Sequence, residues 1–180
     1  MVGRGAGTPQ MEDSLATDDA PLTLARLWRE MTPAQKSAAA ESFWLDDESM
    51  PQQIEAVTHL SRQLHFRPQS VLAMPVDRKV RQLAVQTKLP DSVIGRLLVV
   101  YHLTTQRPML VAFLDKLGIP HEDGLISDTM GEQPAADRVT EAVDALLAAF
   151  PEADVRLYTR TLAVQDPETW GMLAELVTPV

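Results

Sequence analysis

Prolines divide this chain into segments of about the length of a helix. A proline fits the first turn of a helix, where its missing N–H is not needed, but it disrupts the interior of a helix or a central strand. Between the prolines, apolar residues recur three or four positions apart, which is typical of amphipathic helices. The prolines at or just before such segments are Pro33, Pro90, Pro108, Pro134, Pro151 and Pro167.

Helix-capping residues support the same division. Thr32, Pro33 and Gln35 have the spacing of a capping box at the start of a helix. Gly118 stands where an apolar segment ends, and Asp166 precedes Pro167 as an N-cap would. Aromatic residues make up only 5% of the chain, and alternating strand patterns are missing. We expect an all-α fold of about eight helices, in a compact bundle or orthogonal array with no sheet.

The composition excludes several classes of protein. With no cysteine, the chain has no disulfides, thiolate nucleophile, cysteine-bound zinc or iron–sulfur cluster. Residues 1–20 lack the apolar core of a signal peptide, and we expect them to form a flexible tail before a single domain at 21–180. The longest apolar run is interrupted by Arg96 and His102 and is too short for a bilayer span. We therefore expect a soluble, cytoplasmic protein that does not contact a membrane.

The segment LGIPHEDGLISD, residues 117–128, holds the clearest cluster of chemistry-bearing side chains. His121, Glu122 and Asp123 could ligate a divalent metal ion in a hydrolase, because imidazole and carboxylate groups suit such ions. The spacing is that of neither a calcium loop nor a zinc motif, however, and Asp123-Gly124 is a common turn pair. We favour a turn over a metal site, and we expect no cofactor.

The charge distribution is asymmetric. Residues 62–107 contain eight Lys and Arg against two acidic residues, whereas the whole chain has a net charge of −9. Such asymmetry indicates either a surface for an acidic partner or charges that pair within the protein. The candidate partner-binding residues are Arg78, Lys79, Arg81, Lys88 and Arg96.

Residues 78–100 also have the apolar spacing of a helix-turn-helix. Ala84, Leu89, Ile94 and Leu97 occupy the positions that would hold two helices together. The face directed at DNA would comprise Pro90, Asp91, Ser92, Gly95 and Arg96, which include one cation and one carboxylate, whereas DNA affinity rests on several phosphate contacts. A helix-turn-helix regulator that binds nucleic acid is therefore the alternative rather than the main hypothesis.

No serine motif or phosphate-binding loop favours an enzyme. The best interpretation is a non-catalytic, α-helical protein-interaction module with an adaptor or regulatory role. We expect its partner to be another protein, and a second copy of the chain is a further candidate.

Overall fold

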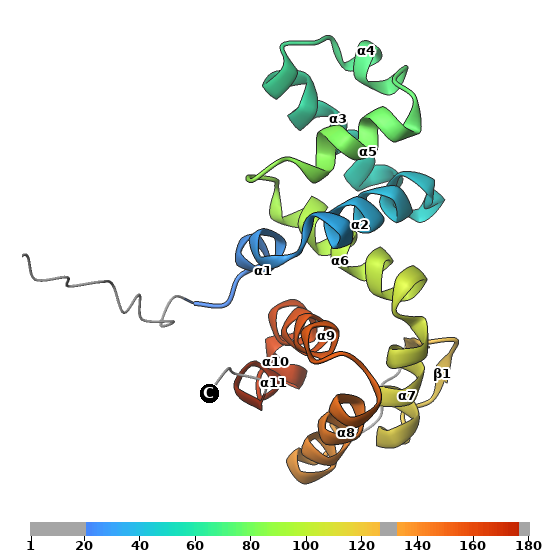
Figure 1. The fold of residues 1–180 in the computed structure, drawn as a ribbon, viewed down its shortest axis with the longest axis vertical. Helices are drawn as coiled ribbons and strands as arrows, with labels where there is room; N and C mark the ends of the chain where they lie inside the picture. The colour runs from blue at the N-terminus through green and yellow to red at the C-terminus, as the bar shows by residue number, and fades with distance from the viewer. Residues whose placement is uncertain (1–20, 127–132, 177–180) are drawn as a thin grey trace, which may run out of the picture.

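The computed structural model describes residues 21–126 and 133–176, and it confirms the expected all-α fold (Figure 1). Helices account for 76% of it, and eight of the helices have seven or more residues. The elements in order are α1 (Leu24–Glu30), α2 (Pro33–Leu45), the 3-10 helix η1 (Asp47–Ser49), α3 (Met50–Leu64), α4 (Pro68–Leu72), α5 (Val76–Ala84), α6 (Asp91–Thr105), α7 (Arg107–Leu117), β1 (His121–Glu122), β2 (Leu125–Ile126), α8 (Ala136–Ala149), α9 (Glu152–Gln165), α10 (Pro167–Trp170) and α11 (Leu173–Leu176).

Helices α1 to α6 surround a first hydrophobic cluster, with α2 packed against both α5 and α6. The capping box expected at the start of α2 is present, because the Thr32 side chain accepts from the Gln35 backbone and the Gln35 side chain accepts from the Thr32 backbone. Two orphan N–H groups of the first turn are thereby satisfied. Trp28 of α1 is fully buried, and its indole donates to the Gln86 carbonyl at 2.8 Å.

Helices α7 to α11 lie in the lower half of Figure 1 and enclose a second hydrophobic cluster. The chain passes from α6 to α7 with a bend of 89°. The two clusters are bridged by Leu22, which packs against both, and by Leu157 of α9, which belongs to the first. Arg160 of α9 also forms an ion pair with Glu30 of α1. The prediction of one domain at 21–180 stays a prediction, and the proposed tail at 1–20 lies outside the described residues.

Three local features differ from the expectation. Residues 121–126 form a small antiparallel hairpin in which His121 pairs with Ile126 and Glu122 with Leu125, although no sheet was expected. The sequence predicts only the end of a helix before Pro68, because the residue before a proline disfavours the helical conformation, but the short helix α4 begins at this proline. The apolar spacing of residues 77–89 predicts a helix that reaches Leu89, but α5 ends at Ala84.

Within 21–126 and 133–176, no single helix is long and apolar enough to cross a membrane. Helices α6 and α7 reach that length and hydropathy only as a pair, across the 89° bend.

Candidate functional site

Residues 62–107, which we call the basic segment, contain five cations that lie exposed on the protein surface. They are Arg62, Arg67, Arg78, Arg81 and Lys88, which we call the basic end. None of the five forms an ion pair with another described residue. Arg62 lies in α3, Arg78 and Arg81 lie in α5, and Arg67 and Lys88 lie in the loops that follow these two helices. This part of the chain occupies one end of the long axis of the molecule, at the top of Figure 1.

The other cations of the segment interact with their own chain. The Lys79 ammonium lies 4.9 Å from the centre of the Trp44 ring, a cation–π contact. Arg107 forms an ion pair with Asp123 at 2.8 Å. Among the five predicted partner-binding residues, Arg78, Arg81 and Lys88 are therefore exposed, whereas Lys79 and Arg96 have intramolecular contacts.

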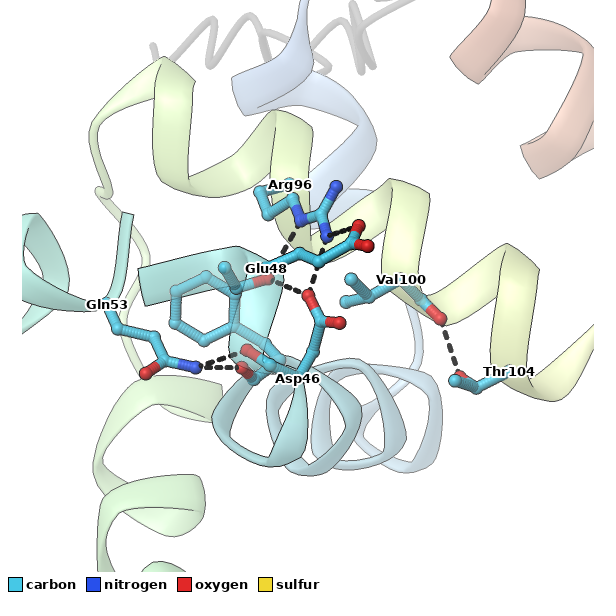
Figure 2. Close-up of polar contacts among 8 residues, drawn as sticks. Asp46, Glu48, Gln53, Arg96, Val100 and Thr104 are labelled. Atoms are coloured by element: carbon cyan, nitrogen blue, oxygen red, sulfur yellow. Dashed lines mark hydrogen bonds and ion pairs between the residues drawn. The ribbon is translucent and has the colours of Figure 1, made fainter. Parts of the chain in front are cut away.

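Arg96 is held in a polar network that joins α6 to the end of α2 (Figure 2). Its Nη2 lies 2.6 Å from Asp46 Oδ2 and 3.4 Å from Glu48 Oε2, and its Nε donates to Ser49 Oγ at 2.8 Å. Gln53 Nε2 donates to the carbonyls of Phe43 and Asp46, at 2.6 and 2.9 Å. The network satisfies carbonyls at the end of α2 that have no partner within the helix.

The charge on Asp46 depends on this network. Partial burial acts to raise its pKa, but hydrogen bonds from Ser49 and Arg96 and the nearby guanidinium charge together hold the pKa below its ordinary value. Arg96 thus stabilises a partly buried joint between helices, and these contacts leave it poorly placed to bind a separate molecule.

The basic end also exposes apolar side chains. Phe66, Leu72 and Val85 have 44%, 56% and 69% of their surface exposed. Along α5 and its C-cap, Arg78, Arg81 and Val85 are exposed at the spacing of one helix face. Cationic and apolar groups thus share this face, a mixture found at protein–protein interfaces.

The helix-turn-helix positions are only partly consistent with DNA binding. Ile94 and Leu97 are buried, as the template requires. On the face of α6 that would read DNA, Ser92 hydrogen-bonds to Glu55, and the Gly95 carbonyl accepts from Gln165 at 3.0 Å. Together with the contacts of Arg96, these bonds occupy that face within the protein.

His121, Glu122 and Asp123 lie on β1 and in the turn of the hairpin. His121 Nδ1 accepts from the Gly124 backbone and its Nε2 contacts Asp115, both at 3.2 Å. Asp123 pairs with Arg107 and has a φ of 56°, and Glu122 is exposed. The described residues contain no group of three His, Asp or Glu that could hold a metal ion.

A cavity of about 210 Å³ lies between α6, α7, α9 and the hairpin. His102 lines it and is 3% exposed. Burial lowers the pKa of His102 to about 3, so that the imidazole is neutral near pH 7. The only sign of this cavity in the sequence is a histidine in the longest apolar run of the chain.

Comparison with protein-family models, with curated proteins and with solved structures finds no match for this chain.

Proposed function

We propose that the protein is a non-catalytic interaction module that binds an acidic protein surface at its basic end. The observation that carries this proposal is that Arg62, Arg67, Arg78, Arg81 and Lys88 are exposed and form no ion pair within the described chain, although the chain as a whole is acidic. A cation that already pairs with an acidic residue of its own chain attracts an acidic partner only weakly. An unpaired cation attracts and orients an oppositely charged surface.

Two features favour a protein partner over nucleic acid. Phe66, Leu72 and Val85 offer apolar area between the cations, and apolar burial is the main stabilising term in protein association. Nucleic-acid affinity comes mostly from phosphate contacts, which a net charge of −9 opposes at long range. The helix-turn-helix alternative further requires the face of α6 that Arg96, Ser92 and Gly95 occupy with internal contacts.

The test is a double charge reversal, Arg78→Glu with Arg81→Glu, in the full-length chain. A matched control reverses Lys116 and Arg138 to Glu on α7 and α8, which changes the net charge equally at exposed positions far from the basic end. Both variants should keep the helical circular dichroism of the parent. Tagged proteins are then incubated with lysate of the host, and the bound proteins are quantified by isotope-labelled mass spectrometry.

We expect the amount of a defined bound protein with an acidic surface to fall by about tenfold or more in the variant with Arg78→Glu and Arg81→Glu, the α5 variant, and to be unchanged in the control. Equal retention by both variants would contradict the proposal. Fluorescence anisotropy with a random DNA duplex tests the alternative of nucleic-acid binding. If the protein binds DNA in a salt-sensitive way and only the reversal of Arg78 and Arg81 abolishes this binding, a nucleic-acid function is favoured instead.

A further inference from the structure

The cavity beneath the hairpin has an almost entirely apolar wall. Leu103 of α6, Leu110 and Leu114 of α7 and Leu162 of α9 contribute to it. Leu125 and Ile126 of β2 also line it while keeping 55% and 37% of their own surface exposed. An apolar pocket with few polar groups is typical of sites for small molecules.

Hydrogen bonding fixes which nitrogen of His102 carries the proton. The Thr161 hydroxyl donates its single proton to the Leu157 carbonyl at 2.7 Å. Thr161 Oγ1, 3.2 Å from His102 Nε2, must therefore accept from that nitrogen, so Nε2 bears the proton. In the neutral ring Nδ1 is then an acceptor with a free lone pair.

His102 Nδ1 is buried and has no hydrogen-bond partner. A buried acceptor without a partner is unfavourable, and such groups in native proteins usually have a water or ligand as partner. The neighbouring rings of Tyr101 and Tyr158 pack edge-on against the imidazole, at centroid distances of 5.4 and 5.3 Å. These contacts limit how far the ring can turn toward another partner.

We propose that this cavity binds a small neutral molecule that combines an apolar body with one hydroxyl or N–H group, which donates to His102 Nδ1. The residues that line the cavity include no Lys, Arg, Asp or Glu, so a charged ligand would be desolvated without compensation. An apolar cavity of roughly 150 Å³ is enough for benzene. The volume of about 210 Å³ therefore suits a substituted six-membered ring. This site is independent of the basic end.

Phenol and toluene are matched probes, because they differ only in a hydroxyl and a methyl group of similar size. Each is titrated into ¹⁵N-labelled full-length protein and followed by NMR. We expect saturable shifts at amides of α6, α7, α9 and the hairpin. With phenol alone, the ¹⁵N resonance of His102 Nδ1 should move upfield, as an acceptor nitrogen does when it gains a hydrogen bond.

A variant isolates the contribution of the acceptor. His102→Phe keeps an aromatic ring but removes Nδ1, and it should reduce the ratio of phenol affinity to toluene affinity by roughly tenfold. The proposal fails if neither probe gives saturable shifts at millimolar concentration, or if the shifts lie outside the cavity. It also fails if the Nδ1 resonance responds equally to both probes. The last criterion needs only the parent protein and holds even if the variant does not fold.

Discussion

His102 combines a titratable side chain with almost complete burial, which links its protonation to folding. Its pKa is about 3 in the folded protein and about 6.5 in an unfolded chain. Below pH 6.5 the unfolded state binds a proton that the folded state does not. The stabilising effect of the neutral imidazole is therefore complete above pH 6.5 and is lost progressively toward pH 3.

We predict that the free energy of unfolding falls through this residue between pH 6.5 and 4.5, with a slope that approaches about 1.4 kcal/mol per pH unit once the unfolded imidazole is fully protonated. Glu30 and Asp46 both have lowered pKa values, so their stabilising contributions begin to fall near their unfolded pKa values of 4.5 and 3.8, at the acidic edge of this window and below it. Urea unfolding at a series of pH values measures the slope. In His102→Phe the slope over this window should be smaller by that amount, whatever the variant does to stability at pH 7; an unchanged slope would show that His102 does not couple to folding.

Single residues also show what sequence reasoning can and cannot find. Asp123-Gly124 was recognised as a turn from its residue types, and the φ angles of 56° and 90° agree. The sequence also shows that Arg96 is a cation, but it does not show that Arg96 pairs with Asp46, which lies 50 positions away in the chain. No local pattern could distinguish it from Arg78, which remains exposed.

At the scale of elements, two glycines on consecutive helices should respond oppositely to alanine. Gly118 ends α7 in the left-handed region, with a φ of 71°, where a side chain is strained. Gly95 lies inside α6, where an added Cβ would meet only ordinary contacts with Leu24 and Gln165, at 3.6 and 3.9 Å.

We predict that Gly118→Ala destabilises the protein by about 1 kcal/mol and that Gly95→Ala stabilises it by up to about 1 kcal/mol. Thermal and urea unfolding of the two variants, compared with the parent, provide the measurement. The same sign of change in both variants would mean that the backbone conformation of α6 or α7 differs from that described.

Helix boundaries were predictable where a local cap defines them. Thr32 and Gln35 mark the start of α2, and Gly118 marks the end of α7, because capping depends on residues within one turn. The sequence does not predict α4, because a proline at the end of an apolar segment usually ends a helix, although a proline in the first turn also permits a helix to start. The hairpin was missed because each strand has only two residues, too few to show alternation.

At the scale of the whole molecule, the sequence indicated the fold class but not the arrangement of its parts. Periodic apolar residues identify which face of a helix is buried, not which helix covers it. The 89° bend between α6 and α7 therefore could not be predicted from the sequence. The cavity could not be predicted either, because two of the residues that line it, His102 and Thr161, are 59 positions apart in the chain. The basic segment was recognised, but its division into exposed and paired cations required the structure.

Positive and negative charges are unequally distributed along the long axis of the molecule, which makes it an electric dipole. Residues 50–90 hold six Lys and Arg against two acidic residues, and residues 133–176 hold three against eight. The first set includes the basic end, and helices α8, α9, α10 and α11 of the second lie toward the opposite end (Figure 1). Near the isoelectric point of about 4.8 the net charge no longer keeps copies apart, but the dipole persists.

Opposite ends of neighbouring molecules should then attract, and small ions should screen that attraction. We predict that solubility is lowest near pH 4.8 and that about 0.1 M sodium chloride raises it there. At this salt concentration, charges attract one another only over about 10 Å. Static light scattering at low and moderate salt would show the second virial coefficient becoming more positive. A second virial coefficient that becomes more negative with salt would indicate that copies of the protein associate through apolar surface and that the basic end does not contribute to this association.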